Sequence, residues 1–218
     1  MLRKKPPGKL LESAHNVARE FKVIAAVGHA GVPVPRAIYL CQDPKVLGTD
    51  FYIMSHVRGV VHKDPSLPGV PPGVRNAIYR SAIKTLASIH AVDPEGVGLG
   101  QFGRAPGYAG RQVQRWREQY LRSVPQPMHE VMRLVQWLGA HVPAASDLAP
   151  YAHPGTGGTL VHGDFRLDNV IYEETTPSRV LAVLDWELST LGDPLSGAAA
   201  DAGAAKVHRD SSPAPVAA

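Results

Sequence analysis

Three side chains that can handle a metal ion or a proton fall at the ends of short apolar segments. Asp164 and Asn169 stand five positions apart on a stretch that leads into the apolar segment 170–172, and Asp185 follows the apolar segment 180–184. Short apolar runs bounded by turn residues are typical of buried strands. Loops at the ends of rigid strands can converge on one point, so we expect these three residues to form one site.

The chemistry that suits these residue types is phosphoryl transfer from a nucleoside triphosphate. Magnesium prefers oxygen ligands and is usually held by one or two carboxylates together with phosphates and water, and Asn169 and Asp185 offer such oxygens. The acceptor hydroxyl must also be oriented and lose its proton, which a carboxylate on the same loop can do. We therefore expect Asp164 to be the catalytic residue and Mg²⁺ and ATP to be the cofactors.

The motif H-G-D-x-x-x-x-N at 162–169, followed by an apolar strand and D-W-E at 185–187, resembles the aminoglycoside phosphotransferase and choline-kinase family. Protein kinases use the same spacing logic in their H-R-D-x-x-x-x-N loop and D-F-G aspartate. The wider wording, with LRKKPPG at 2–8 and GVPVPR at 31–36, is most similar to the kinase-like domain fused to, or encoded beside, acyl-CoA dehydrogenases. The resemblance covers about residues 1–197.

This resemblance implies an α+β fold of the protein-kinase type. It predicts a partial N-terminal lobe at 1–58, with a strand, a helix, a hairpin and the hinge, and a mainly helical C-terminal lobe at 59–197 with a catalytic β-hairpin. Residues 198–218 are rich in Ala, Pro and Ser, a composition typical of disorder. Family members begin with further strands, whose turn closes over the phosphates, and end with further helices, so we expect a chain truncated at both ends.

The phosphate site implied by the family pairs a basic residue on a strand with a glutamate on the next helix. Glu20 lies on a helix predicted to begin near Ser13, and it is the candidate for the glutamate. The resemblance aligns Arg3 with the basic residue more naturally than Lys4, and the choice between the two stays open. The alternative for Glu20 is an ordinary solvated helix residue near Arg19.

The adenine site implied by the family lies at the hinge between the lobes. Two predicted strands, 37–41 and 51–56, form a hairpin joined by a turn. In the family, backbone groups at the end of the second strand hold the base, which places Met54, Ser55 and Val57 near the adenine. Taken alone, the same segment is a buried strand.

Five residues around the two motifs are expected to support the site. His162 is expected to be structural, with its ring stacked under the catalytic loop, because the loop aspartate already serves as the base. Asp168 suits a turn-stabilising role, and Arg166 lies beside it on the loop. Glu187 is expected to face the acceptor or a second ion, and Asp193 to brace the loop.

Amphipathic helices are predicted at 74–90, 110–123 and 128–141, with Trp116 and Trp137 among the apolar residues expected in the core. In the family the helical lobe carries the acceptor site. Arginines of the second of these helices can meet an anionic acceptor such as a coenzyme A ester, although a solvated helix face explains most of them: Arg111, Arg115 and Arg117.

A glycine-rich stretch at 98–103 matches the pattern G-x-G-x-x-G, which is associated with phosphate binding. No strand precedes it, and the segment at 104–107 contains Pro106 and cannot open a helix. The structural context that gives this pattern its meaning is therefore missing. We expect this stretch not to touch a nucleotide phosphate.

Composition excludes several classes of protein. Residues 1–22 hold six Lys or Arg and two Glu, so this segment accounts for the whole net charge of +4, and a phosphate site explains the cluster better than nucleic-acid binding. The single cysteine, Cys41, excludes a disulfide framework. No apolar run is long enough to span a membrane, and the start lacks the apolar region of a signal peptide. We expect a cytoplasmic protein without nucleic-acid or membrane partners.

Two functions of different classes remain. The first is an ATP- and Mg²⁺-dependent kinase that phosphorylates a hydroxyl of a small molecule, with a hydroxyacyl-CoA as the expected acceptor and an acyl-CoA dehydrogenase as the expected partner, both from the resemblance. The second is a truncated, catalytically inactive remnant or interaction module. A metal-dependent hydrolase is a third and weaker reading, because no pairs of histidines with metal-ligand spacing are present.

Overall fold

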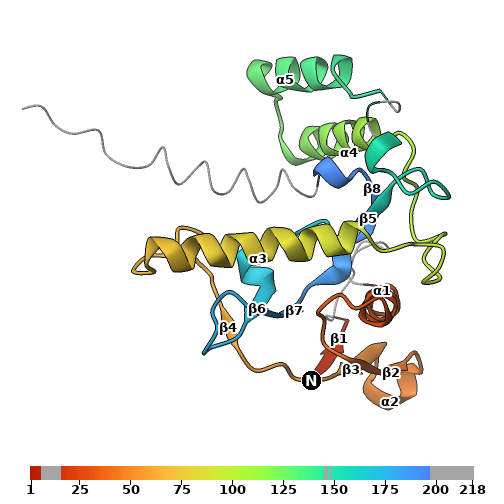
Figure 1. The fold of residues 1–218 in the computed structure, drawn as a ribbon. Helices are drawn as coiled ribbons and strands as arrows, with labels where there is room; N and C mark the ends of the chain where they lie inside the picture. Colours follow the sequence, from red (N-terminus) through yellow and green to blue (C-terminus); the bar gives the residue numbers. More distant parts are fainter. Residues whose placement is uncertain (6–15, 145–146, 148, 197–218) are drawn as a thin grey trace, which may run out of the picture.

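The structure is a computed structural model that describes residues 1–5, 16–144, 147 and 149–196, with three small antiparallel sheets among helices (Figure 1). The predicted tail, 198–218, lies outside these residues, as does Ser13. The helices are α1 Val17–His29, α2 Pro44–Leu47, α3 Pro72–His90, α4 Tyr108–Ser123 and α5 His129–Ala140, with 3-10 turns at Ala149–Tyr151, Leu167–Asn169 and Trp186–Leu188. The strands are β1 Leu2–Lys4, β2 Ala37–Cys41, β3 Phe51–Met54, β4 Val60–Val61, β5 Thr159–Val161, β6 Val170–Tyr172, β7 Val180–Val183 and β8 Thr190–Gly192.

The first sheet has the order β1-β3-β2, and α1 packs against it. The register of β1 and β3 places Arg3 opposite Tyr52. Helix α1 is capped by Asn16, whose side chain accepts a hydrogen bond from the N–H of Arg19 at 3.0 Å. Its apolar stripe, including Val23 and Val27, is buried.

The connection between β2 and β3 differs from the expected plain turn. Asp43 caps a one-turn helix, α2, and its side chain accepts a hydrogen bond from the N–H of Lys45 at 2.9 Å. Pro44 suits the first turn of this helix because its missing N–H has no partner to lose there. Strand β3 also ends at Met54, two residues earlier than the expected strand 51–56.

The second sheet has the order β4-β6-β7 and contains the predicted catalytic hairpin, with Val170 opposite Val183. The third sheet pairs β5 with β8. Strand β4 joins the second sheet through β6, with Val60 opposite Tyr172. Strand β4 has two residues and is too short to show an alternating pattern in the sequence. It is recognised as a strand by its pairing with β6.

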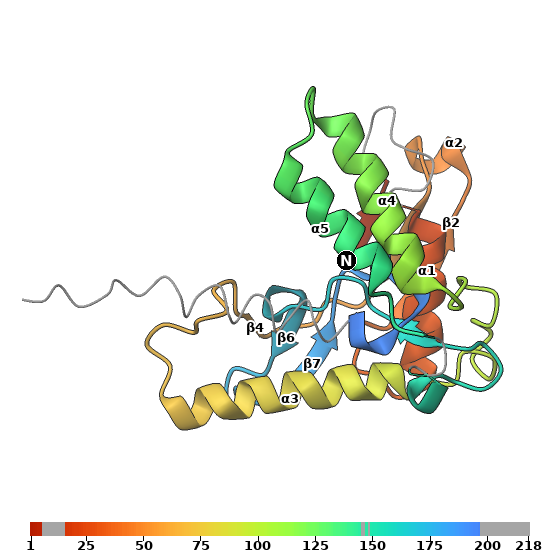
Figure 2. The same cartoon turned by 90° about the horizontal axis from the view of Figure 1, so that it is seen from above.

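Helix α3 runs alongside β6 and β7 (Figures 1 and 2). Its buried side, which includes Ile78, Ala82 and Ile89, belongs to one cluster that also contains Val23 of α1 and Trp186. Tyr52 of β3 belongs to the same cluster, so the first sheet and the segment that carries the D-W-E motif share a hydrophobic core. None of the described helices is both long and apolar enough to cross a membrane.

Helices α4 and α5 form a hairpin (Figure 2). Its two tryptophans are exposed, contrary to the prediction from sequence. Trp116 is 61% and Trp137 is 56% exposed, and neither helix has a buried residue. The ring of Trp137 stacks on His141, with 4.3 Å between the ring centroids. The amphipathic period correctly predicted both helices, but it does not say which surface covers their apolar side.

Candidate active site

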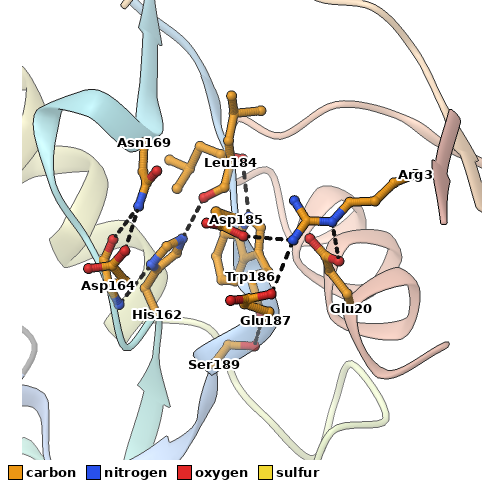
Figure 3. A network of polar contacts seen from close by, with 11 residues as sticks. Arg3, Glu20, His162, Asp164, Asn169, Leu184, Asp185, Trp186, Glu187 and Ser189 are labelled. Atoms are coloured by element: carbon orange, nitrogen blue, oxygen red, sulfur yellow. Dashed lines mark hydrogen bonds and ion pairs between the residues drawn. The ribbon is translucent and has the colours of Figure 1, made fainter. Parts of the chain in front are cut away.

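The spacing of five residues between Asp164 and Asn169 closes a hydrogen-bonded loop. The chain leaves β5 at Val161, passes through His162 and Gly163, and returns by a 3-10 turn to Asn169 at the start of β6. The Nδ2 of Asn169 donates to the backbone oxygen of Asp164 at 2.8 Å and to its Oδ2 at 3.0 Å (Figure 3). The amide therefore orients the carboxylate of Asp164 and leaves its own oxygen directed away from it.

His162 is fully buried beneath this loop. Its Nε2 donates to the backbone oxygen of Leu184 at 2.9 Å, and its Nδ1 accepts from the N–H of Asp164 at 3.3 Å. The ring packs edge-on against Trp186 at 4.7 Å. Burial lowers the pKa of His162 to about 4, so the ring is neutral and its tautomer is fixed by these two bonds. The structural role expected for His162 is compatible with these contacts and stays a prediction.

Gly163 allows the loop to approach the D-W-E segment closely. Its φ is +88°, and a Cβ added to it would lie 2.5 Å from the backbone oxygen of Leu188. Only glycine adopts this conformation without cost. The glycine of the H-G-D motif therefore lets two segments far apart in the sequence meet.

Asp185 stands in an unusual backbone conformation at the end of β7. Its φ of 63° lies in the left-handed region, which Asp tolerates better than most residues. The N–H of Leu184 donates to the backbone oxygen of Asn169 at 2.8 Å, which holds the two strand ends together. Strain of this kind is common at functional sites.

Arg3 reaches across from β1 to three acidic residues (Figure 3). Its Nε lies 2.9 Å from Oε2 of Glu20, and its Nη2 lies 2.9 Å from Oδ1 of Asp185 and 3.3 Å from Oε2 of Glu187. Burial opposes the charge on Arg3, yet Glu20 and Asp185 together raise its pKa. The pKa of Glu20 is also raised, because burial outweighs the opposing effect of Arg3. Lys4 is exposed, as strand alternation requires.

A cavity of about 400 Å³ lies between the first sheet and the catalytic hairpin. The predicted nucleotide and metal residues line it together, with the exception of Lys4: Arg3, Glu20, Met54, Ser55, Val57, Asn169 and Asp185. Pro35, Tyr52 and Ile171 also line it and were missed from sequence. The position of Tyr52 opposite Arg3 in the sheet is the signal that could have found it.

Some backbone groups of the hinge segment form hydrogen bonds within the protein, and others do not. The N–H of Met54 donates to the oxygen of Met1, and the N–H of Ser55 donates to the oxygen of Arg36, both at 2.9 Å. In the described part of the chain, the carbonyl of Ser55 and the N–H of Val57 take part in no hydrogen bond. An acceptor and a donor two residues apart are thus available at the cavity edge.

The remaining supporting residues divide between the two ends of the site. Arg166 bridges the loop, with its Nε 3.2 Å from Oδ1 of Asp164 and its Nη2 3.0 Å from Oδ2 of Asp168. Asp193 is buried outside the cavity, where its Oδ1 accepts from the N–H of Leu195 at 2.8 Å. Its contacts are those of a brace.

The side chains that could hold a metal ion are oxygen donors. Among the described residues, no group of three or more His, Cys, Asp or Glu is placed to hold a metal ion unaided. A cation bound through the oxygens of Asn169 and Asp185 would need further ligands, such as phosphate and water. This donor set fits Mg²⁺, which keeps waters and shares phosphates, better than it fits zinc.

Comparison with known proteins supplies the family. The model of the phosphotransferase enzyme family, which is the aminoglycoside phosphotransferase type, matches residues 1–199. The chain belongs to this phosphotransferase family. The family is that of kinase-like phosphotransferases, as the resemblance indicated.

The curated relatives of this phosphotransferase are much longer proteins. It is 48% identical over 202 residues to "Probable acyl-CoA dehydrogenase IBR3" of Arabidopsis thaliana, a match covering 89% of this chain and 23% of the relative. It is 47% identical over 199 residues to "Acyl-CoA dehydrogenase family member 10" of Mus musculus, covering 91% of this chain and 18% of the relative. The chain therefore spans about a fifth of the length of these relatives.

Solved structures confirm the protein-kinase-like fold of the phosphotransferase. A "putative aminoglycoside phosphotransferase" of Ralstonia eutropha JMP134 superposes with a TM-score of 0.76 at 40% identity, covering 90% of this chain and 54% of that one. An aminoglycoside phosphotransferase of Streptomyces rimosus, solved with ADP and streptomycin, gives a TM-score of 0.63 at 16% identity, covering 94% and 71%. The second likeness concerns the fold alone.

Proposed function

We propose that this chain transfers the γ-phosphoryl group of ATP, with Mg²⁺, to a hydroxyl group of a small molecule. The observation that carries the proposal is that Arg3 from the first sheet and Asn169 and Asp185 from the catalytic hairpin line a single cavity, while the amide of Asn169 lies 3.0 Å from the carboxylate of Asp164. Phosphoryl transfer depends on positioning and on stabilising charge, and this arrangement offers both. We also propose that residues 1–58 and 59–197 are its two lobes.

Asp164 is the proposed base. The carboxylate accepts from Asn169 and pairs with Arg166, so it is held in place. It is partly exposed, at 33%, and can therefore meet a hydroxyl from solvent. In this role it orients the acceptor hydroxyl and receives its proton as the new O–P bond forms.

Asn169 and Asp185 are the proposed metal ligands. The Nδ2 of Asn169 is committed to Asp164, so its Oδ1 is the atom free to meet a cation. Bound Mg²⁺ would neutralise charge on the β- and γ-phosphates. Oδ1 of Asp185 is paired with Arg3 in this structure, so the proposal requires Arg3 to share its charge with the phosphates once nucleotide is present.

The phosphates and the adenine of the nucleotide have separate proposed binding sites within the cavity. The guanidinium of Arg3, braced by Glu20, faces the phosphates, and it can bind them in a bidentate manner. The carbonyl of Ser55 and the N–H of Val57 present an acceptor and a donor to the adenine edge, with Met54 packing nearby. Proteins of the same fold have been solved with ADP, with ATP and with GDP.

The proposed acceptor is a hydroxyacyl-CoA. Its support is indirect: the chain is similar to one part of proteins named as acyl-CoA dehydrogenases. An enzyme that acts on acyl-CoA esters, on the same chain or beside it, would then share a class of substrate with this one. Aminoglycosides, which the neighbours in fold bind, are the contrasting acceptor class.

One observation favours a second candidate, a catalytically inactive module. The carboxylate proposed to bind Mg²⁺ already has a cationic partner in Arg3, and a stable pair would exclude the metal. The pair is about one-third exposed on each side, so solvent weakens it, and we prefer the first proposal.

The deciding experiment is transfer of labelled phosphate from [γ-³²P]ATP to a panel of hydroxyacyl-CoA esters and to an aminoglycoside, with Asp164→Asn as the matched inactive variant. The proposal predicts Mg²⁺-dependent labelling of the esters by the wild type and loss of that labelling in the variant. No labelling of any acceptor, combined with no binding of ATP by calorimetry, would leave the inactive module.

A further inference from the structure

Arg19 joins α1 to two segments from the other side of the active site. Its Nη2 donates to the backbone oxygen of Phe102 at 2.5 Å and to that of Ser189 at 3.0 Å. Its Cζ also lies 3.6 Å from the centroid of the Phe102 ring. One guanidinium thus makes two charge-assisted hydrogen bonds and one cation–π contact across 83 and 170 positions of sequence.

The two segments that Arg19 binds are buried at the contact, and one of them follows Asp185 directly in the sequence. Ser189 is 2% exposed and ends the turn that begins after Asp185, and its own hydroxyl donates to the oxygen of Trp186 at 2.6 Å. Phe102 is 4% exposed, in the turn with the glycine-rich pattern. A Cβ on Gly103 would lie 2.7 Å from the backbone nitrogen of Leu191. That turn therefore packs tightly against β8.

The neighbour of Arg19 in sequence is Glu20, which is buried and pairs with Arg3. Two consecutive residues of α1 therefore bind two different parts of the site. Arg19 holds the segment that follows Asp185, while Glu20 holds the arginine that contacts Asp185 itself. A shift of α1 along its axis or about it would move Glu20 away from Arg3, and Arg19 opposes that shift.

We infer that Arg19 is a positioning residue for nucleotide binding, which keeps Glu20 beneath Arg3 by tying α1 to the backbone of Phe102 and Ser189. The inference rests on the proposed function and goes beyond it. It also gives the glycine-rich pattern at 98–103 a role, which is to dock α1 instead of binding phosphate. Burial lowers the pKa of Arg19, and its contacts offset the cost of placing that charge there.

The experiment compares Arg19→Met with Lys22→Met, an exposed basic residue on the same helix, in the full chain. Calorimetry measures the affinity for Mg²⁺·ATP, kinetics separate the KM for ATP from kcat, and thermal melting reports stability. We expect Arg19→Met to weaken ATP binding about tenfold or more, in line with the cost of misplacing a binding group. The KM for the acceptor and the behaviour of Lys22→Met should stay close to wild type.

A double-mutant cycle separates positioning from stability. If Arg19 acts through Glu20, then Arg19→Met should weaken ATP binding much less in a Glu20→Gln background than in the wild type. Equal effects in both backgrounds, or an unchanged ATP affinity with only a lower melting temperature, would overturn the inference. A wild type that fails to bind Mg²⁺·ATP would overturn the proposed function as well, whereas normal binding by both wild type and Arg19→Met would overturn the inference alone.

Discussion

Nη2 of Arg3 lies 2.9 Å from Oδ1 of Asp185, across 182 positions of sequence. The same guanidinium holds Glu20 through its Nε, so one side chain links α1 to the proposed metal carboxylate. The fork geometry of arginine makes the two contacts compatible, which a lysine ammonium on a shorter reach could not match. The proposed metal site requires this link to change when a nucleotide binds.

Replacing Arg3 should separate its proposed binding of the phosphates from its pairing with Glu20. Arg3→Met removes the charge, and we expect ATP affinity to fall about tenfold or more through loss of charge-assisted contacts to phosphate. Arg3→Lys should recover only part of this loss, because a point charge cannot hold Glu20 and the phosphates together. Isothermal titration with Mg²⁺·ATP measures both. Lys4→Met, on the opposite side of β1, is the control, and an equal loss there would contradict the assignment of Arg3.

Replacing Asp164 should affect chemistry more than binding. Asp164→Asn keeps the shape of the side chain but cannot accept a proton, so we expect kcat to fall about 10²- to 10⁴-fold with little change in ATP affinity. Steady-state kinetics with a responsive acceptor provide the measurement. Asp168→Asn removes a neighbouring carboxylate that pairs with Arg166, and this variant should keep most of the activity. A near-normal kcat in Asp164→Asn would exclude it as the base.

His162 should make folding stability depend on pH. Its pKa is lowered from 6.5 to about 4 in the folded state, so the folded form disfavours the charged ring. Stability is therefore complete above about pH 6.5 and falls as the pH drops toward 4, by about 3 kcal/mol in total. Urea unfolding between pH 4 and 7 should show a shallower dependence for His162→Gln than for wild type. His141→Gln, an exposed control, should leave the wild-type dependence unchanged.

Gly163 should be intolerant of any side chain. Gly163→Ala places a Cβ against the backbone of Leu188 and forces alanine to a φ of +88°, so we expect a loss of about 2–3 kcal/mol in the free energy of unfolding. Gly139→Ala is the matched control, because nothing lies within 4 Å of its added Cβ and alanine favours the helix by about 0.5–1 kcal/mol. Equal unfolding midpoints for the two variants would contradict the close approach at Leu188.

Sequence predicted those parts of the site that depend on local spacing. The five-residue interval placed Asp164 and Asn169 on one loop, where they form a hydrogen bond that was not itself predicted, and the apolar runs predicted the hairpin that carries Asp185. Strand alternation explains why Arg3, rather than Lys4, faces the cavity, but only once the strand is known to begin at Leu2. The fold class and family were confirmed, while the roles of the individual site residues stay predictions.

The features missed from sequence depend on contacts between distant segments. The left-handed conformation of Asp185 was not predicted from the sequence. The link from Arg19 to Phe102 and Ser189 likewise joins backbone groups whose position only the fold defines. Trp116 and Trp137 were predicted to lie in the core, and this prediction was wrong, because both are exposed. Periodicity identifies the apolar face of a helix but not the surface against which that face packs.

The central claim is that Asn169 and Asp185 share one cation with the nucleotide. Electron paramagnetic resonance with Mn²⁺ in place of Mg²⁺ counts this cation directly, in the presence of ATP. The account predicts one ATP-dependent Mn²⁺ site in the wild type, and a loss of that site in Asp185→Asn and, separately, in Asn169→Ala. Retention of the site with unchanged affinity in either variant would contradict it.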